Sequence, residues 1–407
     1  MICFPPLKTD TAAINNTTFL PNVSQFVNTH ASPKQPQSDT GFANARYSVS
    51  GVITIISNNA RVVANRRRIP KNRNTPTENS FFGTKPYDEA SFNDKNKEYG
   101  FELRYYKGHL NKHNVILTQN VDAVCIFVND TADAEVLHMM ADNGVKLLAL
   151  RCAGYNNVDL KAAADCGITV VRVPAYSPYA VAEYTVALML SLNRKIPRAT
   201  WRTRDGNFSL HGLLGFDMYG KTVGIIGTGK IAKKLIMILR GFGMNVLAYD
   251  LYPDYNFARE HQVVYTTLDE LYHSSDIISL HCPLTEQTKY LINDYSISKM
   301  KEGVMIINTG RGQLIHTNAL IEGLKNKKIG SAGLDVYEEE GEYFYEDQSD
   351  RIIDDDVLAR LLSFNNVIVT SHQAFFTREA LENIATTTLQ NIKDFASGKA
   401  LENEVKI

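Results

Sequence analysis

One stretch decides the fold: Thr222-Val223-Gly224-Ile225-Ile226-Gly227-Thr228-Gly229-Lys230-Ile231-Ala232. It begins as an apolar run, turns at glycines and continues in the pattern of an amphipathic helix, which we predict over 231–241. In such a turn, Gly227 permits the sharp change of direction and Gly229 lets a pyrophosphate approach the backbone, while small Ala232 allows the helix to pack closely on the strand. The free N–H groups at the start of the helix bind phosphate. The stretch therefore predicts a dinucleotide site.

The next strand along the chain indicates which dinucleotide binds there. The apolar run Asn245-Val246-Leu247-Ala248-Tyr249 ends at Asp250. A carboxylate at that position accepts hydrogen bonds from a ribose diol and repels a 2′-phosphate. The sequence therefore favours NAD over NADP.

Short apolar runs alternate with amphipathic segments on both sides of these two strands. The runs predicted to be strands are 123–128, 146–150 and 169–173 before them, and 277–280, 304–308, 332–336 and 367–370 after them. A long helix, predicted from Ala180 towards Arg194, connects the two groups, and a last helix is predicted over 378–396. This alternation is typical of parallel α/β proteins. We therefore predict a Rossmann-type doubly wound parallel sheet and a second α/β domain.

Composition excludes several classes of protein. The chain of 407 residues has 43 Lys and Arg against 44 Asp and Glu, so it lacks the positive excess that captures nucleic acid or an anionic membrane. No apolar run approaches the roughly 18 residues that a membrane-spanning helix needs. Its five cysteines form no CxxC pairs, which indicates reduced thiols and no zinc site. We expect a soluble protein without a metal.

Residues 1–78 differ from the rest of the chain. They contain nine basic and three acidic residues, are rich in Asn, Thr, Ser and Pro, and hold a single apolar run, 52–56. We predict a low-order extension. An acid-poor leader is compatible with an organelle transit peptide, although Pro5, Pro6 and Asp10 interrupt a helix there. A dispensable tail and a mistaken start of translation are the alternatives.

Three candidate catalytic residues follow predicted strands of the dinucleotide-binding sheet. Arg311 lies in a glycine-flanked loop, Glu340 ends the acidic run that follows Asp335, and His372 lies just beyond the last strand. Each alone is more typical of a surface turn, a solvated loop or a structural histidine. Because ligands bind outside the carboxyl ends of parallel strands, the three side chains could converge on one cofactor. An arginine there suits two-point capture of a carboxylate, and a histidine suits proton transfer.

Several blocks of sequence, in the same order, resemble one family. They are Lys85-Pro86-Tyr87-Asp88, 150–159, 173–178, 227–232, 281–285, the Arg311 loop, 335–340 and 372–375. From Phe81 to its end, the chain is similar to the D-isomer-specific 2-hydroxyacid dehydrogenases and, within them, most similar to NAD-dependent D-lactate dehydrogenases. One departure is the polar stretch Thr77-Glu78-Asn79-Ser80, where the family begins with an apolar strand. This departure leaves open whether a first strand forms there.

The resemblance implies a role for each candidate residue. Arg311 would bind the substrate carboxylate, His372 would be the acid/base, and Glu340 would be the partner of His372. The other substrate-binding residues it implies are Ala153, Gly154, Tyr176 and Phe375. The cofactor-binding residues would be Gly227, Thr228, Gly229, Lys230, Ile231, Asp250, Cys282, Pro283, Thr288, Thr309, Gly310 and Asp335.

The resemblance also implies the organisation and the activity. An NAD-binding domain would span 178–373, and a discontinuous flavodoxin-like substrate domain would span 79–177 and 374–407. We expect reversible reduction of pyruvate to D-lactate by hydride transfer from NADH. Another small 2-oxo acid (hydroxypyruvate, glyoxylate or 2-oxoisocaproate) is an alternative substrate, and an NAD-sensing, corepressor-like binding protein is an alternative of another class. We expect a homodimer, located in the cytoplasm, or in mitochondria if residues 1–78 are a transit peptide.

Overall fold

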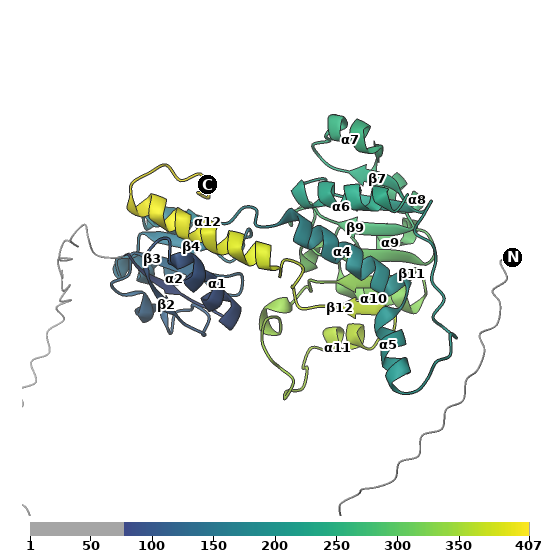
Figure 1. Cartoon of the computed structure of the whole chain (residues 1–407), viewed down its shortest axis with the longest axis horizontal. Coiled ribbons are helices and arrows are strands. Elements are labelled where there is room, and N and C mark those ends of the chain that lie inside the picture. Colours follow the sequence, from purple (N-terminus) through teal and green to yellow (C-terminus); the bar gives the residue numbers. More distant parts are fainter. Residues whose placement is uncertain (1–76, 407) are drawn as a thin grey trace, which may run out of the picture. The chain divides into compact units, whose positions relative to one another are not determined.

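The computed structural model describes residues 77–406, which form two parallel β-sheets with helices on both faces of each (Figure 1). The predicted extension lies outside the described residues apart from its last two, Thr77 and Glu78. Within 77–406, no helix is both long enough and apolar enough to cross a membrane. In the same range, no group of three His, Cys, Asp or Glu side chains is arranged to hold a metal ion.

The first sheet has five strands in the order β2-β1-β3-β4-β5, and all of its pairings are parallel. The strands are β1 (Glu78–Phe81), β2 (Glu102–Tyr105), β3 (Ala123–Ile126), β4 (Leu147–Leu150) and β5 (Thr169–Val171). The helices are α1 (Pro86–Asn96), the 3-10 turn η1 (Val115–Thr118), α2 (Ala134–Asp142), α3 (Leu160–Asp165) and, from the end of the chain, α12 (Arg378–Ala396). α12 packs on α1 and β4, so the last helix completes this sheet's packing (Figure 1).

Side chains of each strand alternate between two separate cores, as the pleat of a strand requires. Ala123 and Cys125 face the core that contains α12, whereas Val124 and Ile126 face the core that contains α2 and α3. Both cores exclude water, because all four side chains are buried. The near-continuous apolar runs in the sequence reflect this burial on both faces.

The second sheet has seven parallel strands in the order β12-β11-β10-β9-β6-β7-β8. The strands are β6 (Thr222–Ile226), β7 (Asn245–Tyr249), β8 (Val263–Tyr265), β9 (Ile277–Leu280), β10 (Val304–Asn308), β11 (Ile329–Leu334) and β12 (Val367–Val369). The helices are α4 (Pro178–Asn193), α5 (Ile196–Arg204), α6 (Lys230–Gly241), α7 (Tyr255–His261), α8 (Leu268–Ser274), α9 (Asp294–Lys299), α10 (Thr317–Lys325) and α11 (Asp356–Leu362), with 3-10 turns η2 (Gly312–Leu314) and η3 (Glu340–Glu342). The strand order reverses at β6, which lies between β7 and β9, so a crevice for ligand is expected at that point. The α/β prediction is confirmed.

The long helix α4 begins at Pro178, two residues before the predicted start. Ser177 caps it by accepting a hydrogen bond from Ala180 N, and proline suits the first helical position. α4 lies beside α6 and covers β10 and β11 (Figure 1). The predicted domain boundary at 177/178 falls at this cap, and the boundaries themselves remain a prediction.

The polar stretch 77–80, where the sequence does not decide whether a strand forms, contributes to β1. Asn79 and Ser80 are fully buried, and the Asn79 NH2 group and the Ser80 hydroxyl find partners, whereas Asn79 Oδ1 has none among the described residues. The Asn79 amide donates to Thr77 O and Glu102 O, and the Ser80 hydroxyl donates to Leu117 O. Buried polar groups are tolerated when they are hydrogen-bonded. β1 therefore takes a central place in the sheet despite its polar sequence.

Candidate active site

The glycine turn between β6 and α6 has the geometry that its sequence predicts. Gly227 has φ +89°, and a Cβ there would lie 2.6 Å from Cys282 N, so only glycine fits. Gly229 caps α6, and a Cβ there would meet no atom within 4 Å. The space above Gly229 is therefore open, and the free N–H groups of the first turn of α6 border it. This arrangement fits a dinucleotide pyrophosphate.

Asp250 follows β7 and lies against the glycine turn. Its Oδ2 accepts hydrogen bonds from Thr228 N at 2.5 Å and Thr228 Oγ1 at 2.9 Å, and its Oδ1 accepts one from Tyr252 N at 2.8 Å. Partial burial raises the pKa of this carboxyl, but the hydrogen bonds from Thr228 and Tyr252 outweigh burial and leave it below its ordinary value. Asp250 is therefore an ionised carboxylate at the position where a ribose diol would be bound.

Five more of the predicted cofactor residues follow β9 and β10: Cys282, Pro283, Thr288, Thr309 and Gly310. Cys282 contacts the Gly227 turn, as described above, and Thr288 donates its hydroxyl hydrogen to Pro283 O at 2.7 Å. Thr309 Oγ1 lies 3.1 Å from Thr185 Oγ1 of α4. These contacts fix the two loops that follow neighbouring strands, at the edge of the sheet that carries Gly229.

A groove runs beside the start of α6. It is lined by Ala153, Pro174, Ala175, Tyr176, Ser177, Pro178, Gly229, Lys230, Ile231, Ala232 and His281. Burial lowers the pKa of His281 to about 4, so its imidazole is neutral at physiological pH. The groove therefore connects the phosphate end of the dinucleotide site to the segment 174–178.

A second cavity shares Ala153 and Tyr176 with this groove. Its lining residues are Phe127, Val128, Arg151, Cys152, Ala153, Gly154, Tyr176, Arg311, Tyr345, His372, Phe375 and Ile384. All five predicted substrate-binding residues and the predicted acid/base therefore line one cavity. Thr228, Asp250, Cys282, Pro283, Thr288, Thr309, Gly310 and Asp335 line neither the cavity nor the groove.

Arg311 is held at the cavity by the loop that follows β10. The Asn308 amide donates to Arg311 O at 2.8 Å, and Arg311 Nη1 donates to Gly310 O at 2.8 Å. A Cβ at Gly154 would lie 2.6 Å from Arg311 Nη2, so the guanidinium occupies the space that this glycine leaves free. The Arg311 guanidinium and the backbone of Gly154 thus lie side by side in the lining of the cavity.

His372 and Glu340 form the pair that the sequence predicts. His372 Nδ1 lies 2.9 Å from Glu340 Oε1, and Glu340 Oε2 accepts a hydrogen bond from Tyr337 N at 3.0 Å. His372 has φ +53°, in the left-handed region, which is unusual for a residue with a Cβ. With Nδ1 turned to the carboxylate, Nε2 is the ring nitrogen left for a ligand in the cavity.

The backbone around His372 is held by Asp335, a role that the sequence alone does not reveal. The Asp335 carboxylate accepts hydrogen bonds from Thr370 Oγ1, Gln373 N and Ala374 N at 2.6, 2.9 and 2.8 Å, and Asp335 O accepts one from His372 N. Burial raises the pKa of Asp335 in spite of these hydrogen bonds. Both carboxylate oxygens are thus engaged in holding the turn, and the implied contact of Asp335 with the nicotinamide remains a prediction.

Other titratable groups of the cavity stay protonated at neutral pH. Burial raises the pKa values of the Cys152 thiol and the Tyr176 phenol to about 12 each. It also raises the pKa of the Tyr345 phenol. The cavity therefore offers no thiolate nucleophile at neutral pH.

Sequence reasoning missed several residues that shape the cavity. Tyr345 and Phe127 line it, with ring centroids 5.3 Å apart, and Arg151 stacks on Phe127 at 4.9 Å. Arg172 Nη1 donates to Ala153 O at 2.9 Å and so fixes the backbone beside Gly154. No local motif marks these residues, because their partners lie far away in the sequence.

Known proteins resemble this chain over both sheets. The family model described as D-isomer specific 2-hydroxyacid dehydrogenase, NAD binding domain, matches residues 186–374. A 2-hydroxyacid dehydrogenase homolog of Haemophilus influenzae is 53% identical over 326 residues, which are 80% of this chain and 98% of that protein. The D-lactate dehydrogenase of Escherichia coli is 52% identical over 324 residues, again 80% of this chain and 98% of the relative. The solved structure of the pyruvate reductase of Chlamydomonas reinhardtii has a TM-score of 0.77 and 44% identity, over 81% of this chain and 99% of that one.

Proposed function

The chain belongs to the D-isomer specific 2-hydroxyacid dehydrogenase family, an NAD-dependent oxidoreductase family, and from this premise we propose that it reduces pyruvate to D-lactate and catalyses the reverse reaction. The observation that carries the proposal is a single cavity lined by Arg311, Gly154 and His372, with Glu340 bonded to His372. A groove from the glycine turn of α6 shares residues with that cavity. A nucleotide and a small acid could therefore meet there.

We assign the substrate carboxylate to Arg311. The guanidinium provides parallel N–H donors that match the two oxygens of a carboxylate, and the backbone N–H groups of Ala153 and Gly154 would add further donors. Arg311 is already placed by Gly310 O and by the space over Gly154. Binding the carboxylate at this fixed point would present one face of the 2-oxo group to the cofactor, which sets the chirality of the product.

We assign proton transfer to His372. NADH, when bound, supplies the hydride that reduces the carbonyl carbon, and the carbonyl oxygen then needs a proton. Glu340, at 2.9 Å from His372 Nδ1, fixes the ring, so Nε2 is the atom that would donate this proton. In the reverse direction, neutral His372 would accept the hydroxyl proton.

The aromatic lining favours a small substrate. Phe127, Tyr176, Tyr345 and Phe375 all line the cavity, and the Tyr176 and Phe375 rings lie 5.9 Å apart. Bulky side chains leave little space beyond the reacting carbon. Pyruvate is therefore the proposed substrate in preference to 2-oxoisocaproate.

The test is turnover by the purified chain. Pyruvate, hydroxypyruvate, glyoxylate and 2-oxoisocaproate would each be offered with NADH, the NADH absorbance followed, and the chirality of the product determined. We expect the highest kcat/KM with pyruvate and a D-product. A higher value with another acid would change the substrate, an L-product would overturn the stereochemistry, and NADH binding without turnover of any acid would favour the binding-protein alternative.

We also propose a homodimer, formed through the surface that begins at α5. This helix and the segment after it expose large apolar side chains: Ile196, Trp201, Phe208, Leu210, Leu214 and Tyr219. Large apolar side chains exposed along one stretch of chain are typical of a protein interface, and a second copy is the occupant we propose. Light scattering of wild type and Leu210→Asp would test it, because the charge should yield monomers.

The proposed location is the cytoplasm, with mitochondria as the alternative. The choice depends on residues 1–78, which carry the basic excess. Fluorescent fusions with and without those residues would decide it, since a transit peptide would move only the longer fusion into the organelle.

A further inference from the structure

The segment that follows η3 contacts the part of the chain built on the first sheet. Glu346 Oε1 lies 2.5 Å from Lys85 Nζ and 3.3 Å from His109 Nε2. The Asn129 amide donates to Phe344 O at 3.4 Å. In each contact the two partners are more than 200 positions apart in the sequence, so the contacts join the segment after η3 to residues around the first sheet.

The same segment also contacts the proposed acid/base. The Tyr345 hydroxyl donates to His372 O at 3.2 Å, and the two rings lie 5.8 Å apart. On its other side, the Tyr345 ring packs edge-on against Phe127 at 5.3 Å. Tyr345 has φ +69°, a backbone conformation that residues with a Cβ rarely adopt. Contacts with other residues therefore hold Tyr345 in this position. Tyr345 thus lies between the first-sheet residue Phe127 and His372, next to Glu346.

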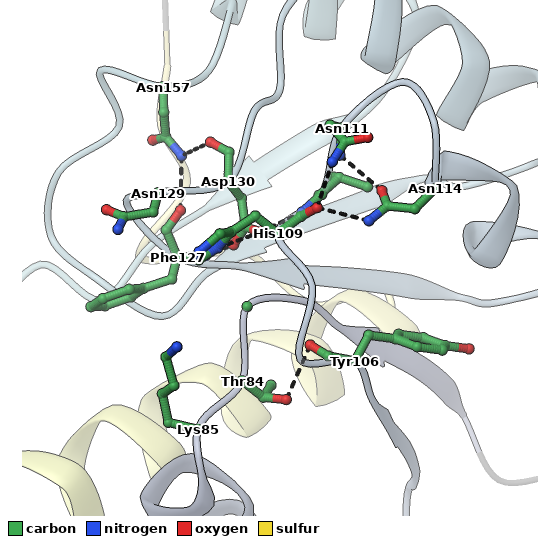
Figure 2. A network of polar contacts seen from close by, with 12 residues as sticks. Thr84, Lys85, Tyr106, His109, Asn111, Asn114, Phe127, Asn129, Asp130 and Asn157 are labelled. Carbon is green, nitrogen blue, oxygen red and sulfur yellow. Dashed lines mark hydrogen bonds and ion pairs between the residues drawn. The ribbon is translucent and has the colours of Figure 1, made fainter. Parts of the chain in front are cut away.

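The partners of Glu346 and Tyr345 belong to a well-bonded framework, which Figure 2 shows. Asp130 is buried and accepts hydrogen bonds from Leu110 N and Phe127 N, each at 2.6 Å. The Asn157 amide donates to Phe127 O and Asp130 O, each at 2.8 Å, on the side of Asp130 away from His109 (Figure 2). His109 and Phe127 therefore lie on loops that are fixed by hydrogen bonds, and the segment with Tyr345 and Glu346 packs against them.

Lys85 is fixed as well. It precedes α1, and its backbone N–H donates to Asp88 Oδ2 at 3.0 Å. The side chain of Lys85 is mostly buried, at 19% exposure, whereas the Glu346 side chain is 40% exposed. The Lys85 ammonium is therefore held in place. Glu346 is the member of the pair whose segment, the one that follows η3, is attached by the contact.

We propose that Glu346 is a positioning residue for the reaction: by binding Lys85 and His109 it clamps its segment to the first sheet and so holds Tyr345 against His372. This inference rests on the proposed function, because His372 is the acid/base there. Released from the clamp, Tyr345 would lose its contact with Phe127, and the His372 ring would no longer be supported on that side. The Glu340 contact alone would then orient the imidazole.

The charges around His109 make the clamp sensitive to pH. Asp130, 3.8 Å from His109 Nδ1, and Glu346 on the Nε2 side both raise the pKa of His109, against burial, which lowers it. The hydrogen bond from Lys85 is the main cause that lowers the pKa of Glu346, and the charge of His109 lowers it further. The clamp is thus strongest with His109 charged, and at alkaline pH Lys85 alone would hold Glu346.

The test compares Glu346→Gln with Asp350→Asn in the full chain. Both substitutions replace an exposed carboxylate in one loop by an amide, and Asp350 does not line the cavity. With Glu346→Gln we expect kcat to fall about five-fold, the scale of two partly exposed ion pairs, with the dissociation constant for NADH unchanged within about two-fold. The loss should be greater at acidic than at alkaline pH. Hydrogen exchange of residues 343–350 should speed up in Glu346→Gln and not in Asp350→Asn.

The outcomes separate this proposal from the proposed function. Wild-type kcat and exchange in Glu346→Gln would overturn the clamp, and faster exchange with wild-type kcat would overturn its positioning role. An equal loss of kcat in Asp350→Asn would also overturn it. If the wild type turns over no 2-oxo acid, the proposed function falls, and the exchange measurement still decides whether Glu346 holds the segment. Lys85→Gln should reproduce the exchange result from the other side of the pair.

Discussion

Gly154→Ala tests the carboxylate site without removing any of its charges. The new Cβ would lie 2.6 Å from Arg311 Nη2, whereas ordinary contacts begin at 3.4 Å, so the guanidinium must move. Gly154 does not have a positive φ, so alanine fits the backbone, and the atom that must yield is the end of a flexible side chain. We therefore expect a folded protein whose Arg311 is displaced.

The displacement should affect substrate binding far more than stability. Misplacing a binding group by about 1 Å can cost about 100-fold in rate, and a two-point carboxylate contact depends strongly on geometry. We expect kcat/KM for pyruvate to fall about 10- to 100-fold, mainly through KM, with the thermal midpoint changed by no more than about 2 °C. Steady-state kinetics at saturating NADH and a thermal melt give both quantities.

A matched control is Gly241→Ala. Gly241 is the last residue of α6, is exposed, and has no atom within 4 Å of its added Cβ, so kinetics should be those of the wild type. A wild-type KM for pyruvate in Gly154→Ala would refute the placement of the carboxylate between Gly154 and Arg311. A large drop in the thermal midpoint would refute the claim that only the guanidinium yields.

Four further predictions concern single groups. Arg311→Lys should raise the KM for the 2-oxo acid about 10-fold or more, since an ammonium cannot make the two-point contact; an unchanged KM would move the anchor elsewhere. His372→Ala should lower kcat by at least about 100-fold, and near-normal turnover would assign the acid/base to another residue. Asp250→Ala should narrow the preference for NADH over NADPH, measured as the ratio of kcat/KM values, and an unchanged ratio would remove Asp250 from cofactor selection. Asp130 raises the pKa of His109, and Glu346 raises it further. The free energy of folding gained from these contacts is therefore present below the ordinary histidine pKa and is lost as the pH rises through the raised pKa of His109. The thermal midpoints of wild type and His109→Gln should therefore converge at alkaline pH, and a gap independent of pH would contradict this linkage.

Much of the architecture could be predicted because hydrophobic period and turn chemistry are local properties. The last helix occupies the predicted range 378–396, and α6 begins one residue before its predicted start, at Lys230. Errors arose where a side chain formed a cap or a distant bond. α4 begins at Pro178 and not at Ala180, because Ser177 accepts a hydrogen bond from Ala180 N and caps the helix. Whether β1 forms cannot be predicted from its own residues, because partners of the buried Asn79 amide N–H and Ser80 hydroxyl lie 23 and 37 positions away.

The orientation of the candidate acid/base could not be predicted, because it is set by the pairing of two strands. β11 and β12 pair with Leu334 opposite Val369, so Asp335 and Thr370 leave the sheet side by side and their side chains bond at 2.6 Å. That bond, with the two backbone N–H groups of Gln373 and Ala374, forces the chain into the turn in which His372 takes its left-handed conformation. Neither segment alone contains this information, since a one-residue slip of the strands would place a different side chain beside Thr370. The histidine can therefore be found from the sequence, whereas the direction of its ring depends on strand register and on a buried aspartate 37 residues earlier.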